Sequence, residues 1–324
     1  MIVGTVCLSH CPLMDRTRAP AEAETRFNAA VQEASAFAAE ARPDLTVLFF
    51  PDHLNGFFYD LLPCFCIGVQ GESIGDYGTV PGQLDIPELL AMDCAASCIK
   101  AGVDTGISYK MKVDHGAVQP IELLSRTHPL TRMLPIFINC VADPRPSFAR
   151  AAALGRAVGK WAQARPERIL LVGSGGLSHD PPLPTLSNAA PEVKARLTNG
   201  ANLTHAERVS RQHRTFEAGY NKPDTSLRPL NPEWDRKFLD ALIRGDLTVL
   251  DDIDDDTITN TAGSGAHELR TWIAALSAAK LDGTTAANLL FYEPIEEWIT
   301  GMGIMTASSS SHPRNLQVDA RCPT

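Results

Sequence analysis

Each of three histidines lies just beyond a short apolar run with the length of a buried strand: His10 after Ile2–Leu8, His53 after Leu45–Phe50 and His179 after Ile169–Val172. In an open α/β sheet, ligands bind beyond the carboxyl ends of the strands. These imidazoles are therefore expected at one edge of a sheet, although they are far apart in the sequence. A single histidine at a strand end is most often a structural hydrogen-bond partner. Several of them at one edge indicate a functional site.

Glu268 can supply a carboxylate to the same site. It stands at the expected start of a helix, after Gly263–Gly265 and before an apolar-periodic segment over 269–276. Two neutral imidazoles and one carboxylate form the facial triad that holds non-haem Fe(II) and leaves positions open for substrate and O2. The pattern predicts His10, His53 and Glu268 as Fe(II) ligands. The same ligand types also suit Zn²⁺, so a zinc hydrolase is the alternative.

The segment Gly173–His179 carries two further alternatives. Its glycines could cradle a phosphate, but the segment lacks both GxGxxG and the Lys-Ser/Thr pair of a P-loop. Ser174 or Ser178 could be a nucleophile with His179 as its base. Adjacent residues of an extended segment point to opposite faces, however, and GxSxG is not matched. A glycine turn that delivers His179 is the favoured interpretation.

The composition excludes several classes of partner. The 324 residues include 29 Lys+Arg and 38 Asp+Glu, a formal net charge of -9, without a basic cluster, so nucleic acid is not expected to bind. No apolar stretch reaches the roughly 18 residues of a membrane span, and the N-terminus has no basic signal-peptide region. We therefore expect a cytoplasmic protein without membrane association. The eight cysteines include no CxxC pair and are expected to be reduced.

Alternating strands and helices must position these side chains. A further strand is expected at Leu134–Ile138, and helices at Ala21–Ala41, Pro87–Ala101 and Phe148–Ala164. The alternation predicts an α/β fold with a central, mostly parallel mixed sheet covered by helices on both faces. Residues 1–305 are expected to form a single catalytic domain with a helical excursion near 187–221. Residues 306–324 are expected to form a flexible tail.

At these residues the sequence resembles the class III (LigB-type) extradiol ring-cleavage dioxygenases over nearly its whole length. The segments that carry the resemblance are residues 7–13, 51–60, 113–116 and 173–179 and the pair His267-Glu268. Carried over to this chain, the resemblance implies Fe(II) ligands at His10, His53 and Glu268. It also implies that His115 and His179 are the acid and base beside the iron.

The resemblance further implies the substrates: O2 and a catechol that bears a propionate or acrylate side chain, such as 3-(2,3-dihydroxyphenyl)propionate or its cinnamate analogue. Another 3-substituted catechol is the alternative. Asp114 is expected to orient His115, and the candidates for substrate contact are Asp114, Asn55, Phe57 and Tyr59. A homo-oligomer is implied as well. Memo-type relatives bind without catalysis, but the complete set of five metal and acid–base residues speaks against that interpretation.

Overall fold

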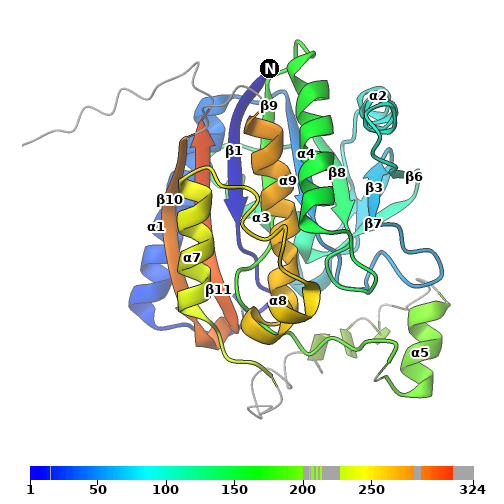
Figure 1. The fold of residues 1–324 in the computed structure, drawn as a ribbon, viewed down its shortest axis with the longest axis vertical. Coiled ribbons are helices and arrows are strands. Elements are labelled where there is room, and N and C mark those ends of the chain that lie inside the picture. The colour runs from blue at the N-terminus through cyan, green and yellow to red at the C-terminus, as the bar shows by residue number, and fades with distance from the viewer. Residues whose placement is uncertain are drawn as a thin grey trace, which may run out of the picture.

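The computed structural model describes residues 1–308 except for residues 15, 188, 200–203, 205, 208, 211, 214–226 and 281–285. An eight-stranded mixed sheet forms the centre of the molecule (Figure 1). In spatial order its strands are β10 (Ala286–Ile295), β11 (Thr300–Ser308), β1 (Ile2–Leu8), β9 (Ile169–Ser174), β2 (Leu45–Phe50), β8 (Met133–Ile138), β3 (Phe65–Gly68) and β6 (Gly106–Ser108).

The four central strands, β1, β9, β2 and β8, run parallel to one another. Leu8 of β1 pairs with Ser174 of β9, and Phe49 of β2 pairs with Gly173, so these strands end at nearly the same level. β11 joins β1 antiparallel, β10 joins β11 antiparallel, and β3 joins β8 antiparallel. The predicted α/β class with a mostly parallel mixed sheet is confirmed.

Helices cover both faces of this sheet (Figure 1). The helices α1 (Ala21–Ala41) and α3 (His115–Leu124) share one apolar core with Leu48 and Phe50. Val47 and Phe49 point to the opposite core, because successive side chains of a strand alternate between faces. That second core includes residues of α2 (Glu88–Lys100), α4 (Phe148–Gln163), α7 (Pro232–Ile243) and α9 (Leu269–Ala279). Both faces of β2 are therefore buried in apolar cores, which explains its continuous apolar sequence.

A second sheet of three short strands lies beside the first. Its order is β5 (Gly82–Gln83), β4 (Gly71–Ser73) and β7 (Met111–Val113). The 3-10 turn η1 (Asp76–Gly78) connects β4 to β5, and β7 leads directly into α3. The remaining described elements are α5 (Pro191–Thr198), α8 (Asp255–Ala262), η2 (Ser264–Glu268) and η4 (Glu296–Trp298).

Two predicted segments differ from the structure or lie partly outside the described residues. The predicted excursion over 187–221 contains α5, but much of it lies outside the described residues. β11 continues to Ser308, so residues 306–308, predicted as the start of the tail, instead pair within the sheet. Residues 309–324 lie outside the described part, and the single domain over 1–305 stays a prediction. The described cysteines are free thiols, and no described helix is long and apolar enough to cross a membrane.

Candidate metal centre

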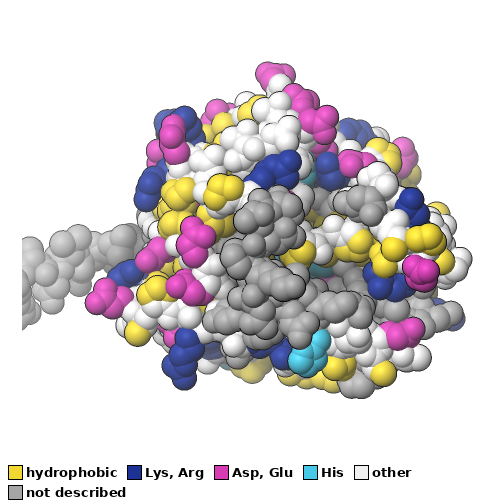
Figure 2. Space-filling model, turned by 90° about the horizontal axis from the view of Figure 1, so that it is seen from below, with side chains coloured by type: hydrophobic (Ala, Val, Ile, Leu, Met, Phe, Trp, Pro, Cys, Tyr) yellow, Lys and Arg dark blue, Asp and Glu magenta, His cyan; other side chains and the backbone are white. Residues whose placement is uncertain are grey.

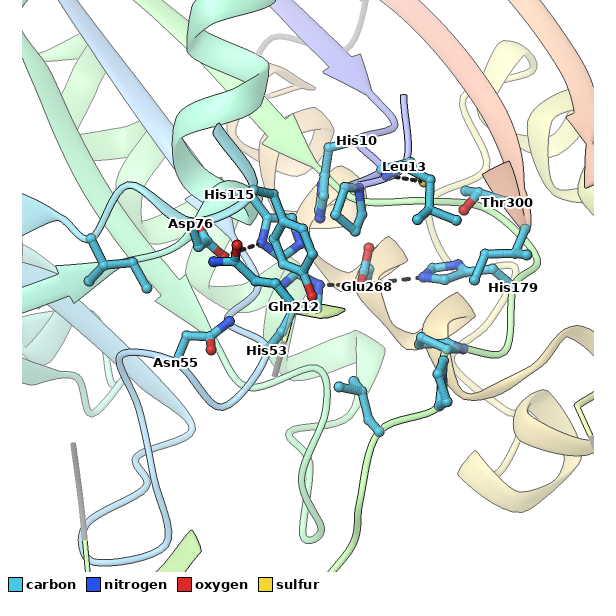
Figure 3. Close-up of a pocket in the computed structure, with 18 residues that line it drawn as sticks. His10, Leu13, His53, Asn55, Asp76, His115, His179, Gln212, Glu268 and Thr300 are labelled. Carbon is cyan, nitrogen blue, oxygen red and sulfur yellow. Dashed lines mark hydrogen bonds and ion pairs between the residues drawn. The ribbon is translucent and has the colours of Figure 1, made fainter. Parts of the chain in front are cut away.

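One cavity gathers the four histidines and the glutamate that the sequence singles out (Figure 3). It lies where the carboxyl ends of β1, β2 and β9 meet the starts of α3 and α9. Its polar lining residues are His10, His53, Asn55, Asp76, His115, His179, Gln212, Glu268 and Thr300, and its apolar walls include Leu13, Ile74, Pro181, Pro182, Leu183 and Ile299. Figure 2 shows the molecule from this end, with acidic and basic side chains interspersed over the described residues.

His10 follows the end of β1, and its buried ring has Nδ1 hydrogen-bonded within the protein. Its Nδ1 lies 2.9 Å from Oγ of Ser174, which donates its own hydrogen to the carbonyl oxygen of Gly116 at 2.5 Å. Ser174 must therefore accept from His10, so the proton of the neutral ring is on Nδ1 and the lone pair is on Nε2. Burial lowers the pKa of His10 to about 3, which keeps the ring neutral.

His53 leaves β2 and is held by Asp114. Nδ1 of His53 donates to Oδ2 of Asp114 at 2.9 Å, and the backbone N–H of His53 donates to the same oxygen at 3.0 Å. Burial alone would lower the pKa of His53, but the carboxylates of Asp114 and Glu268 outweigh it and raise this pKa well above its usual value. Nε2 is left to face Oε1 of Glu268, at 3.1 Å.

Asp114 is the N-cap of α3 and accepts four hydrogen bonds in all. Besides the two from His53, it accepts from Nδ2 of Asn55 at 2.9 Å and from the backbone N–H of Gly116 at 3.0 Å. Burial raises the pKa of Asp114, but His53 and His115 outweigh burial and hold it far below its usual range. This fully buried carboxylate does not line the cavity. It aligns His53, and its contact with substrate stays a prediction that the cavity lining does not support.

Glu268 ends the turn η2 at the start of α9, and its side chain is 2% exposed. Its Oε2 accepts from the backbone N–H of Gly176 at 2.8 Å. Its Oε1 lies 3.1 Å from Nε2 of His53 and 3.5 Å from Nε2 of His179. Burial raises the pKa of Glu268, but His179 and the other neighbouring histidines lower it well below the usual value, so the carboxylate is ionised.

His115, the first residue of α3, has a partner that the sequence analysis missed. Its Nδ1 lies 2.6 Å from Oδ2 of Asp76, whereas Oδ2 of Asp114 is 3.8 Å away. The expectation that Asp114 orients His115 is therefore wrong, because Asp114 is already committed to His53. Asp76 lies in the run Gly75-Asp76-Tyr77-Gly78, whose turn composition was the available signal.

His179 is placed by a close approach of backbone to its ring. Its Nδ1 donates to the carbonyl oxygen of Leu177 at 2.9 Å, so Nε2 carries the lone pair of the neutral ring and lies 3.5 Å from Oε1 of Glu268. A Cβ on Gly265 would lie 2.1 Å from Nε2 of His179, so only glycine fits there. Burial would lower the pKa of His179, but Glu268 outweighs it and the pKa is raised.

The two serines considered as nucleophiles are engaged elsewhere. Oγ of Ser178 donates to Oδ2 of Asp235 at 2.7 Å, and Oγ of Ser174 donates to the carbonyl oxygen of Gly116. Neither hydroxyl hydrogen is directed at His179. The geometry therefore favours the interpretation of this segment as a turn that delivers His179.

Of the three remaining candidates for substrate contact, one lines the cavity and two do not. Asn55 lines the cavity, and its backbone N–H is held by Asp52 at 3.0 Å. Phe57 instead stacks on Phe137, with ring centroids 3.8 Å apart, and Tyr59 packs in a small apolar cluster beside α5. Neither ring lines the cavity, because both anchor the loop after β2, and their contact with substrate stays a prediction.

The donor atoms fit a divalent metal ion. His10 and His53 each have Nδ1 hydrogen-bonded within the protein. Nε2 of His10 carries a lone pair, and Nε2 of His53 faces Oε1 of Glu268. The other oxygen of Glu268 is held by the backbone N–H of Gly176. Hydrogen bonds of this kind orient metal ligands and set the tautomer of ligating histidines. His10, His53 and His115 also offer ring nitrogens within 4.8 Å of one another. Two imidazoles and a carboxylate without a thiolate suit Fe(II) or another first-row ion.

The chain is similar to a family of known proteins over nearly its whole length. Residues 4–303 match the model of the family described as "Catalytic LigB subunit of aromatic ring-opening dioxygenase". A protein from Rhodococcus sp is 45% identical over 309 residues, which cover 95% of this chain and 98% of that protein. A protein from Paraburkholderia xenovorans (strain LB400) is 45% identical over 303 residues, which cover 93% of this chain and 96% of that protein. Both are named "2,3-dihydroxyphenylpropionate/2,3-dihydroxicinnamic acid 1,2-dioxygenase".

A solved structure has the same overall fold. The crystal structure of an uncharacterized protein from Escherichia coli K12 matches with a TM-score of 0.51 and covers 94% of this chain and 99% of that one. Its sequence identity is 14%, so this likeness concerns the fold alone.

Proposed function

The chain belongs to the family of catalytic LigB subunits of aromatic ring-opening dioxygenases, and we propose that it opens catechols by extradiol (meta) cleavage with Fe(II) held by His10, His53 and Glu268. The observation that carries this proposal is one cavity lined by two oriented imidazoles and one ionised carboxylate, with Nε2 of His53 facing Oε1 of Glu268. When bound there, Fe(II) supplies open coordination positions for a catechol and O2 and a path for electrons between them.

His179 is the base in this proposal. Its Nδ1 hydrogen is committed to the carbonyl oxygen of Leu177, so the lone pair of Nε2 faces the cavity. An imidazole in this tautomer can remove a phenolic proton from a catechol, and the neighbouring Glu268 favours the protonated ring that results. His179 is 8% exposed, which limits exchange of that proton with bulk water.

His115 is the acid. Its Nδ1 is bonded to Asp76, and its ring stacks on His53 with centroids 4.4 Å apart. The ring thus lies beside the proposed ligands. In its protonated form it carries a hydrogen on both nitrogens, and it can deliver the one on Nε2 to an oxygen atom of the reacting group. Cleavage of the ring bond next to the diol adds both atoms of O2 to the product. In one cycle His179 gains a proton and His115 loses one, so a proton must pass from His179 to His115 before the next turnover.

The substrate that we propose is 3-(2,3-dihydroxyphenyl)propionate or its cinnamate analogue, because the similar proteins carry these substrates in their names. The apolar walls formed by Ile74, Pro182 and Leu183 suit an aromatic ring, and Asn55 offers a polar contact. A homo-oligomeric assembly and a cytoplasmic location stay predictions.

Anaerobic loading with Fe(II), followed by oxygen-electrode assays across a panel of catechols, tests this function. We expect one O2 consumed per catechol and a yellow ring-opened product, with the propionate-substituted catechol giving the highest kcat/KM. Protein loaded with Zn²⁺ under the same conditions is the control and should consume no O2. Iron-loaded protein that binds catechol without consuming O2 would contradict the proposal.

A further inference from the structure

A strained turn of the small sheet carries Asp76 into the cavity. Gly75 has φ of 67° and Tyr77 has φ of 50°, a left-handed conformation that is unfavourable for tyrosine. The backbone N–H and Oγ1 of Thr79 both donate to the carbonyl oxygen of Asp76, at 3.0 and 2.7 Å. Strain of this kind persists where the surrounding structure holds it, and it is concentrated at functional sites.

The carboxylate of Asp76 has one side-chain partner among the described residues, and that partner is His115. Oδ2 accepts from Nδ1 of His115 at 2.6 Å, and the buried Oδ1 has no hydrogen-bond partner in the described part of the chain. Asp76 is 4% exposed and His115 is 3% exposed, so water does not compete for the contact. The edge of the Tyr77 ring packs against His115, with centroids 4.8 Å apart.

We propose that Asp76 is the positioning residue for His115. Its carboxylate keeps a hydrogen on Nδ1 and fixes the ring plane, so that Nε2, on the opposite side of the ring, faces the reacting group and is the atom that carries the proton to be delivered. The second carboxylate of the region, Asp114, serves His53. Two neighbouring histidines thus receive separate carboxylates from different elements, β4–η1 for His115 and the start of α3 for His53. This inference rests on the proposed function.

Asp76→Asn tests the inference because it keeps the shape of the side chain but removes the carboxylate that fixes the tautomer. We expect full Fe(II) occupancy, an unchanged KM for the catechol and a kcat lowered by about 10- to 100-fold, the usual effect of losing such a partner. Asp114→Asn is the contrast and should lose affinity for Fe(II) instead. Glu72→Gln, a half-exposed carboxylate of the same small sheet, is the matched control and should change nothing.

A double-mutant cycle separates positioning from a general structural effect. If Asp76 acts through His115, Asp76→Asn has no further effect on kcat in a His115→Gln background. The same loss in both backgrounds would overturn the inference, and so would an unchanged kcat in Asp76→Asn or a loss that follows the iron content.

A milder variant keeps the test independent of folding. Thr79→Val removes the hydroxyl bond that anchors the turn and should lower kcat less than Asp76→Asn, again only while His115 is present. A kcat effect of Thr79→Val that persists in the His115→Gln background would contradict the inference. Failure of the proposed function is distinguishable, because the unmodified iron-loaded protein would then consume no O2 with any catechol.

Discussion

Oε1 of Glu268 lies 3.1 Å from Nε2 of His53, although 215 residues separate them in the sequence. Each side chain has its other polar atom fixed by the protein: Nδ1 of His53 by Asp114, and Oε2 of Glu268 by the backbone N–H of Gly176. Without a metal ion, a proton bridges the two free atoms. A divalent ion would take the place of that proton, so metal binding and the ionisation of this pair are linked.

The ligand assignment predicts which variants lose iron. Glu268→Gln and His53→Gln should abolish tight Fe(II) binding, because each removes one of three donors from the set. Metal analysis after anaerobic loading measures the effect. Glu296→Gln, an exposed glutamate of η4, is the matched control. Stoichiometric iron in purified Glu268→Gln would reject this carboxylate as a ligand.

A different result is expected for the proposed base. His179→Gln should retain iron, since His179 contributes no donor to the set, while kcat falls by about 100- to 10,000-fold, the range of general acid–base catalysis. Parallel measurement of iron content and O2 consumption separates the two quantities. Loss of iron in proportion to activity would show that His179 acts through the metal site.

The sequence predicted the central architecture because local patterns determine it. The runs at Ile2–Leu8 and Leu45–Phe50 are strands with the predicted bounds, and Ala21–Ala41 is the predicted helix. Their apolar periodicity is intrinsic to each segment. The convergence of His10, His53 and His179 also followed from one rule, that the carboxyl ends of parallel strands meet at one edge.

Side-chain partners could not be predicted in the same way. Asp114 is adjacent to His115 in the sequence, yet the extended backbone at Asp114 turns its carboxylate toward His53. Asp76 reaches His115 across 39 residues from the turn after β4, so only the pairing of β4 with β7 in the small sheet brings the two together. The rings of Phe57 and Tyr59 were likewise assigned by proximity in sequence, whereas packing decides which way each ring points.

A buried histidine outside the proposed ligand set gives the protein a predictable response to acid. Nδ1 of His267 accepts from Nη1 of Arg270 at 2.8 Å, so the ring is neutral, and Nε2 lies 2.8 Å from Oγ1 of Thr259. Burial and the nearby Arg270 lower the pKa of His267 from 6.5 to about 3. As the pH falls below 6.5, the unfolded chain takes up the proton first, so the stability that this neutral ring contributes is complete above pH 6.5 and is lost toward pH 3.

The free energy of unfolding of the His267→Gln variant should therefore fall less steeply than that of the wild type as the pH drops below 6.5. The wild-type protein should lose up to about 1.4 kcal/mol more unfolding free energy per pH unit than the variant between those limits. Urea unfolding of the metal-free proteins at several pH values measures the difference. His128→Gln removes an exposed histidine and should leave the slope unchanged. Parallel profiles for wild type and His267→Gln would contradict the neutral, buried state of this ring.

The tight fit of Gly265 against His179 predicts a variant that damages catalysis through geometry alone. A Cβ at this position would lie 2.1 Å from Nε2 and 2.2 Å from Cδ2 of His179, so the ring must move in Gly265→Ala. Its Nε2 then leaves the position from which it can reach a catechol bound beside Glu268. We expect a large loss of kcat with iron still bound, because no proposed donor atom is displaced by the contact.

Gly106→Ala is the control. Gly106 lies in β6 at the far edge of the sheet, and the nearest neighbour of its Cβ would be 3.3 Å away. Normal turnover by Gly265→Ala would mean that the position of His179 is not critical, and the assignment of His179 as the base would then fail.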